Sequence, residues 1–197
     1  MKAGHDREPM TSRLELDRRP ITVADYHRMI EAGILDEDEH VELVEGVIVT
    51  VGPQGPRHAV VIQRLTALLI RQLGSQHAVR PQLPLTLGEA SEPEPDLAVV
   101  DVAEAASTER HPGHALLVIE VADASLRKDR LVKASLYAAF GISEYWIVNL
   151  TGRRIEVHRD PDAAGRRYRT ILEFSGDQEL RCSSVPAIGV RVDEIIP

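Results

Sequence analysis

The sequence predicts a mixed α/β fold in which helices pack on a central sheet. Two observations predict it: short β-branched runs alternate with two long stretches of helical apolar spacing, and further β-rich pieces follow near the end of the chain. With 197 residues, 43% hydrophobic and 27% charged, the chain can bury a core of ordinary size. We therefore expect a single domain over residues 21–197. Residues 1–20 lack periodicity and carry mixed charge, which predicts a disordered leader.

The first part of the domain is expected to hold a short helix, a hairpin and a long helix. Thr22 can cap the short helix, whose apolar residues recur at helical spacing. The segment 41–52 has the pattern of a hairpin or bent strand around Gly46. Residues 58–73 form the long helix, because they carry one apolar stripe: Val61, Leu65, Leu68, Leu69 and Leu73.

The rest of the chain is expected to supply most of the sheet. In chain order we expect strands at 78–87, 96–100 and 115–121, a long helix at 125–140, a buried strand at 144–150, and antiparallel pieces at 155–159 and 168–174.

Composition limits the partners and the cellular compartment expected for the protein. Its net charge of −8 counts against a broad nucleic-acid surface, although positive charge can gather locally. The single cysteine, Cys182, cannot form an internal disulfide, which fits a reducing compartment. The apolar runs are too short to span a bilayer, and the charged first twenty residues lack a signal-peptide core. We therefore expect a cytoplasmic protein with no membrane partner.

Two acidic residues stand at the ends of neighbouring strand candidates. Asp96 enters one strand and Glu120 closes another, and folding 96–100 against 116–120 as an antiparallel pair sets them roughly opposite each other. Two converging carboxylates need a cation. Hard oxygen ligands, with no nearby Cys and no His cluster, favour Mg²⁺ or Mn²⁺ over zinc. Lys133 follows on the next element, and a lysine beside such a cation indicates phosphodiester chemistry.

The expected helix at 125–140 carries a polar stripe. Residues four apart share one face of a helix, and here they are Ser125, Asp129, Lys133 and Tyr137. We expect the opposite face to pack in the core, with Val132, Leu136, Ala139 and Phe140. An ordinary exposed Asp–Lys pair would give the same pattern. The stripe starts five residues after Glu120, however, so the intervening turn aims it at the carboxylates.

Basic residues gather beside the expected site. Arg127, Lys128 and Arg130 precede Lys133, and we expect these three to bind nucleic acid. Two later arginine groups, at 153–154 and 166–169, are interpreted as solvated turns.

Several segments resemble a known family. VELVEGVIV, SEPEPDLAVV, ALLVIEVADASLRKDRLVKASLYAAFGISEYWIVNL and RRIEVHR together resemble the Uma-type restriction endonucleases of the PD-(D/E)xK nuclease superfamily, over about residues 20–197. The resemblance implies a restriction-endonuclease-like mixed central sheet flanked by helices, with added antiparallel strands. The usual Glu-x-Lys element is altered, because Ala122 stands two residues after Glu120. The resemblance therefore implies that the lysine has moved to the helix, at Lys133.

The resemblance also implies an activity and a metal. The expected function is a Mg-dependent endonuclease that hydrolyses DNA phosphodiester bonds. Asp96, Glu120 and the Val121 carbonyl would hold Mg²⁺ or Mn²⁺, while Lys133 would position or help deprotonate the attacking water and offset charge in the transition state.

Four residues are expected to support this site. Glu42 would be a further ligand or orient water, with an exposed strand-end acid as the equal alternative. His58 would contact phosphate or support the site, with capping or packing as the equal alternative. Ser125 and Asp129 would hold the lysine in place. Tyr137 and Trp146, in contrast, are expected to pack and to take no part in the chemistry.

DNA is the expected partner, and a homodimer is left open. The alternative function is a catalytically inactive nuclease-fold module that binds nucleic acid or protein. The intact set of Asp96, Glu120 and Lys133 favours the nuclease, whereas the acidic net charge and the displaced lysine leave room for the alternative.

Overall fold

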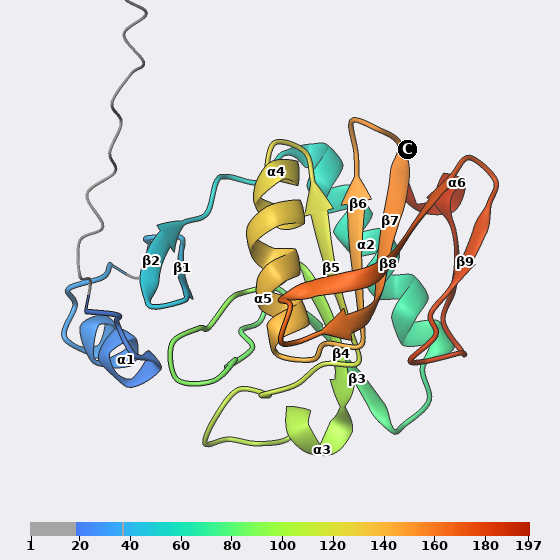
Figure 1. Cartoon of the computed structure of the whole chain (residues 1–197). Helices are drawn as coiled ribbons and strands as arrows, with labels where there is room; N and C mark the ends of the chain where they lie inside the picture. Colours follow the sequence, from blue (N-terminus) through green and yellow to red (C-terminus); the bar gives the residue numbers. More distant parts are fainter. Residues whose placement is uncertain (1–18, 37) are drawn as a thin grey trace, which may run out of the picture.

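A six-stranded mixed sheet forms the centre of the molecule, in the order β3-β4-β5-β6-β7-β8 (Figure 1). The computed structural model describes residues 19–36 and 38–197, so nearly all of the expected leader at 1–20 lies outside the described residues. Strands β5 and β6 are parallel, and all other neighbours in this sheet are antiparallel. The strands are β3 (His77–Pro81), β4 (Leu97–Asp101), β5 (Leu117–Ala122), β6 (Glu144–Asn149), β7 (Arg154–Asp162) and β8 (Arg167–Ser175).

Helices cover both faces of this sheet, which confirms the predicted fold class. Helix α2 (Pro56–Gln72) lies on one face, and three consecutive helical segments between β5 and β6 lie on the other. These segments are α4 (Leu126–Lys128), the π-helical η1 (Asp129–Lys133) and α5 (Ala134–Ala139). Within the described part of the chain, no helix has the length and apolarity needed to cross a membrane.

Smaller elements surround this central unit. They are α1 (Val23–Glu31), α3 (Val102–Ala105), α6 (Val192–Ile195), and two antiparallel pairs, β1 (Val41–Val44) with β2 (Val47–Thr50) and β9 (Glu179–Arg181) with β10 (Gly189–Arg191). The expected short helix and first hairpin are therefore present, and Thr22 Oγ1 caps α1 by accepting from the Asp25 amide.

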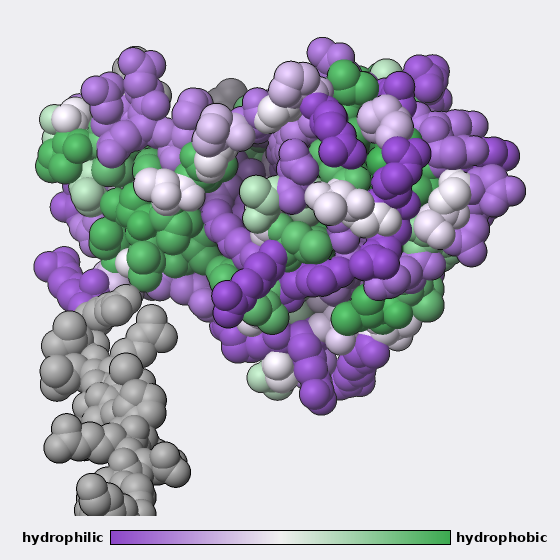
Figure 2. Space-filling view, turned by 90° about the horizontal axis from the view of Figure 1, so that it is seen from above, coloured by the Kyte–Doolittle hydropathy of each residue, from purple (hydrophilic) through white to green (hydrophobic). Residues whose placement is uncertain are grey.

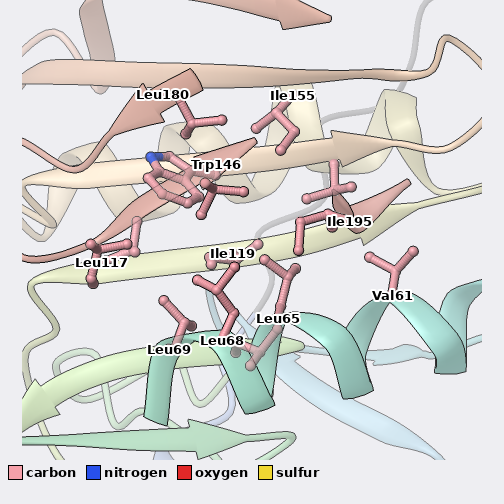
Figure 3. Close-up of a cluster of buried hydrophobic side chains, with 14 of the residues drawn as sticks. Val61, Leu65, Leu68, Leu69, Leu117, Ile119, Trp146, Ile155, Leu180 and Ile195 are labelled. Atoms are coloured by element: carbon pink, nitrogen blue, oxygen red, sulfur yellow. The ribbon is translucent and has the colours of Figure 1, made fainter. Parts of the chain in front are cut away.

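Successive side chains of a strand point to opposite faces of the sheet, so alternate residues belong to two separate apolar cores. Leu97, Leu117 and Ile119 pack with α2, and Figure 3 shows the α2 side chains Val61, Leu65, Leu68 and Leu69 directed at Trp146 and its neighbours. Ala98, Val118 and Ala122 belong to the core beneath α5.

The β1–β2 hairpin is fixed by its turn and by its neighbours. Val44 pairs with Val47, so the loop has two residues, Glu45 and Gly46, and both have positive φ, at 50° and 75°. This is the backbone that two-residue hairpins prefer. A Cβ on Gly46 would also clash with Pro20 Cβ, so there is no space for any residue other than glycine.

Two expectations were wrong in detail. The strand expected at 78–87 ends at Pro81, and the segment after it folds into a loop in which the Leu85 and Leu87 amides donate to the Pro93 and Ser91 carbonyls. The expected helix at 125–140 contains the π-helical segment η1. Its polar stripe is directed at Glu120, as expected, but two residues of the opposite face do not pack in the core. Val132 and Phe140, expected in the core, are about two-fifths exposed, at 41% and 40%.

Candidate active site

The predicted pairing of the two acidic strand ends is confirmed. Strands β4 and β5 are antiparallel, and Leu97 pairs with Ile119 while Val99 pairs with Leu117. Continuing this register by one residue sets Asp96 opposite Glu120. Residues opposite each other in a ladder project from the same face, so the two carboxylates meet at the end of the sheet where β5 finishes. Both side chains are buried.

One oxygen of Asp96 is held by two donors from different elements. The Val121 amide donates to Asp96 Oδ2 at 2.8 Å, and His58 Nε2 on α2 donates to the same oxygen at 3.0 Å. Burial lowers the pKa of His58, but the hydrogen bond and charge of Asp96 outweigh it and raise the pKa above its ordinary value. His58 therefore supports the carboxylate by contact and does not cap the helix.

Glu120 is held by two donors on the inward stripe of the helix. Lys133 Nζ donates to Glu120 Oε1 at 2.8 Å, and Tyr137 Oη donates to the same oxygen at 2.8 Å. Lys133 Nζ also donates to Glu42 Oε1 at 3.0 Å. All four side chains are buried, with Lys133 only 4% exposed. Lys133 is therefore a bridge between two buried carboxylates and does not lie on an exposed helix face.

The charged groups of this cluster shift one another's pKa values. Burial raises the pKa of Glu120 above its ordinary value, while the charge of Lys133 opposes the rise. Burial alone would lower the pKa of Lys133, but Glu120 and Glu42 outweigh it and raise the pKa well above its ordinary range. Burial, and then Glu120, raise the pKa of Tyr137, so its hydroxyl remains a donor. Lys133 is consequently a fixed positive charge at neutral pH.

Glu42 reaches the cluster through the first hairpin. The Glu92 amide donates to the Leu43 carbonyl at 2.7 Å, which joins β1 to the segment that precedes Asp96. The Glu94 amide then donates to Glu42 Oε1 at 3.2 Å. Glu42 is 1% exposed, so the alternative interpretation of it as an exposed strand-end acid was wrong.

The packing around residue 122 leaves no room for a lysine. Ala122, where the usual Glu-x-Lys element has its lysine, is fully buried in the core beneath α5. A lysine at this position would have to displace packed apolar neighbours. Lys133 supplies an ammonium group to Glu120 from the opposite direction, across the space between sheet and helix.

The other predicted residues are placed as follows. Ser125 Oγ donates to Asp129 Oδ2 at 2.6 Å, so these two residues contact each other, but neither forms a hydrogen bond with Lys133 in the described structure. Lys128 Nζ lies 3.4 Å from Glu42 Oε2. Arg130 makes two hydrogen bonds to Glu156, at 2.8 and 2.6 Å. Of the three basic residues expected to bind nucleic acid, only Arg127 has no carboxylate partner among the described residues.

Sequence reasoning assigned Tyr137 to packing and so missed its contact with Glu120. The available signal was its spacing, since Tyr137 lies one helical turn after Lys133 in the same stripe. Trp146, also assigned to packing, is fully buried in the α2 core.

The donor set suits a hard divalent cation. Within the described residues, Asp96 Oδ1 and Glu120 Oε2 accept no protein hydrogen bond, while the other oxygen of each carboxylate is held in place. No group of three or more His, Cys, Asp or Glu side chains is arranged around a metal position in the part of the chain described. Mg²⁺ needs no such group, because it is commonly held by one or two carboxylates and keeps several waters. Asp96 and Glu120 are the residues that would hold it.

Comparisons with known proteins give the family and the fold of this chain. The model of the Uma2 family, described as "Putative restriction endonuclease", matches residues 23–193. The chain belongs to this family. A crystal structure titled a "putative nuclease belonging to DUF820", from Anabaena variabilis, has the same fold with a TM-score of 0.70 at 16% identity. The alignment covers 89% of this chain and 97% of that one. A search of curated proteins gave no match.

Proposed function

We propose that this Uma2-family protein is a divalent-metal-dependent endonuclease that hydrolyses phosphodiester bonds in DNA. The observation that carries the proposal is the convergence of Asp96, Glu120 and Lys133, from two strands and a helix, at one end of the sheet. Among the described residues, each of the two carboxylates keeps one oxygen without a protein donor, and a fixed ammonium group lies 2.8 Å from the second carboxylate.

A divalent cation held by Asp96 and Glu120 would polarise the phosphate and lower the pKa of bound water. The Val121 carbonyl, next to the amide that holds Asp96, is proposed as a third ligand. Lys133 offsets negative charge as it develops on the phosphate. Its raised pKa favours this electrostatic role over the role of general base.

The remaining residues of the site orient these groups. His58 holds Asp96 from α2, while Glu42 holds Lys133 from β1. Ser125 and Asp129 fix the turn of helix before Lys133, and Arg127 is proposed to contact the nucleic acid near the site.

The test is cleavage of supercoiled plasmid by the full chain with Mg²⁺ or Mn²⁺, followed by chelation with EDTA. We expect nicked and linear products that require metal and that disappear in Asp96→Asn and Glu120→Gln. Asp123→Asn is the matched control, because Asp123 lies close in sequence but is exposed. Cleavage that continues in EDTA or in both site variants would refute the proposal.

The alternative is a nuclease-fold module that binds without cleaving. It is favoured by one observation, the direct Lys133–Glu120 ion pair, which occupies an oxygen of a proposed metal ligand. Plasmid binding without metal-dependent cleavage would establish it.

A further inference from the structure

Helix α2 carries a row of arginines on its exposed side. Arg57, Arg64 and Arg71 are spaced seven residues apart, so they share one face of the helix, and all three are exposed. At 1.5 Å per residue, the row is about 21 Å long. The helix has 17 residues and contains no Asp or Glu. A strip of positive charge therefore crosses a protein whose net charge is −8.

The charge of this row is not cancelled by neighbouring carboxylates. None of the three arginines forms an ion pair within the described residues. Arg57 donates to the Leu150 carbonyl at 3.2 Å, and Arg64 donates to the Ile195 carbonyl at 3.2 Å. These acceptors are neutral, so they orient the guanidinium groups and leave their charge in place.

The acidic residues nearest to the row in α6 have another partner. Asp193 and Glu194 both pair with Arg191, at 2.8 and 3.6 Å. In contrast, the basic cluster predicted from the sequence is largely neutralised, because Lys128 pairs with Glu42 and Arg130 pairs with Glu156.

The row begins at the candidate active site. Arg57 precedes His58, whose Nε2 holds Asp96. The residue before the helix, Gly55, makes no side-chain cap, and the first turn contains no acidic residue, so the positive end of the helix dipole is also uncompensated there. Figure 1 shows this end of α2 beside α4, where β5 ends. Seen from above, the described surface is largely hydrophilic, with several apolar patches among the polar side chains (Figure 2).

We propose that duplex DNA lies along α2, with one strand's phosphates held by Arg57, Arg64 and Arg71, and that this row leads the strand to the site at the start of the helix. A row of about 21 Å matches about six phosphates of one strand, at 3.4 Å each along the axis. The inference rests on the proposed function, since it names the surface that presents the substrate.

The experiment compares two triple variants of the full chain. One carries Arg57→Ala, Arg64→Ala and Arg71→Ala. The control carries Arg167→Ala, Arg169→Ala and Arg181→Ala, which removes the same charge from exposed arginines that already have carboxylate partners. Binding of a short fluorescein-labelled DNA duplex is followed by anisotropy in EDTA, between about 50 and 200 mM salt.

We expect the α2 variant to bind about tenfold or more weakly, and its slope of log K against log salt to be shallower by about 2.7, or about 0.9 for each lost phosphate contact. The control should keep the wild-type slope. Equal slopes for the α2 variant and the wild type, an equal loss in the control, or no wild-type binding would each overturn the inference. Melting temperatures of both variants check that the chain is folded.

The outcome is separable from the proposed function. Metal-dependent cleavage with unaltered binding in the α2 variant would overturn the interface and leave the nuclease in place. Binding lost in the α2 variant, with no metal-dependent cleavage by the wild type, would support the interface and reject the nuclease.

Discussion

The α2 face of the central sheet is packed with apolar side chains, whereas the α5 face has charged side chains running through its core. On the first face, Leu65 and Trp146 are fully buried in contact with other apolar residues. On the second, Lys133 and Glu120 are almost as well buried but are held by ion pairs. The two faces share the same strands, and Ile119 and Glu120 are neighbours in sequence.

This difference shows how one strand can serve stability and chemistry together. Because side chains alternate across a strand, β5 directs Ile119 into the apolar core and Glu120 at the helix on the other side. A buried charge is costly unless it is paired and hydrogen-bonded. The cluster meets that condition only while all of its members are present, so the two faces should respond differently to truncation.

The largest effect is expected from Lys133→Met. The change leaves Glu42 and Glu120 buried without their shared cation, so we expect a loss of about 3–5 kcal/mol in the free energy of unfolding, together with loss of plasmid cleavage. Urea unfolding and the plasmid assay measure the two effects.

A second substitution separates stability from chemistry in this variant. Adding Glu120→Gln removes one unpaired charge, so stability should recover in part while cleavage stays absent. A stable and active Lys133→Met protein would contradict both the buried bridge and the proposed role of the lysine.

On the α2 face, Leu65→Ala should destabilise the protein by about 2–5 kcal/mol through lost apolar burial and a cavity. The folded fraction should keep its cleavage activity, because Leu65 belongs to the apolar core on the side of the sheet opposite Lys133. Ile70→Ala on the same helix is the control. Ile70 is 60% exposed, so truncation of its side chain should lower the free energy of unfolding only slightly. If activity fell further than the folded fraction, the two faces would not be independent.

A smaller effect is expected from Tyr137→Phe. This change removes one donor to Glu120 Oε1 but leaves Lys133 in place, so a loss of about 1–2 kcal/mol is expected in urea unfolding. The apparent affinity for Mn²⁺, measured from the shift in melting temperature, should also change, because the orientation of Glu120 relaxes. Tyr168→Phe is the comparison, since the Tyr168 hydroxyl donates to the Ile142 carbonyl away from the site. Equal effects on metal affinity in both variants would show that Tyr137 is not part of the site.

The α2 face was the part of the fold that the sequence predicted best. Its stripe of Val61, Leu65 and Leu69 has a clear helical period, and all three side chains are buried among apolar residues, as the period predicts. The register of β4 and β5 was also predictable, because an antiparallel pairing fixes a constant sum of residue numbers.

The α5 face was harder to predict because its pattern reverses the usual rule. The direction of the stripe towards Glu120 was predicted, but the full burial of Lys133 and Tyr137 and the exposure of Val132 were not, because periodicity normally sends polar residues outward. The π-helical turn at 129–133 and the approach of Glu42 from a distant hairpin are tertiary features with no local sequence signal. The α2 arginines are spaced seven residues apart in the sequence, but this spacing alone does not predict a function. The row is informative only because folding sets its first residue beside the candidate site.

The smallest predicted effect concerns His158, a buried residue on the α5 face but outside the ionic cluster. It packs against Tyr145 and Tyr168, and its Nε2 has no hydrogen-bond partner in the described structure. Burial lowers its pKa below 6.5, with Glu156 opposing the shift and Arg130 reinforcing it. Because the unfolded chain takes up the proton more readily, the stability that neutral His158 contributes is present above about pH 6.5 and is lost as the pH falls through the lower folded pKa.

We expect His158→Phe to melt within a few degrees of the wild type at pH 8. Between pH 6.5 and pH 5 it should lose less stability than the wild type does, by about 1 kcal/mol or less. His77, which is only partly buried, supplies the control variant His77→Phe. Parallel melting curves for the wild type and His158→Phe across this range would show that the buried imidazole does not contribute to acid sensitivity, and that the α5 face tolerates an added charge away from its ionic cluster.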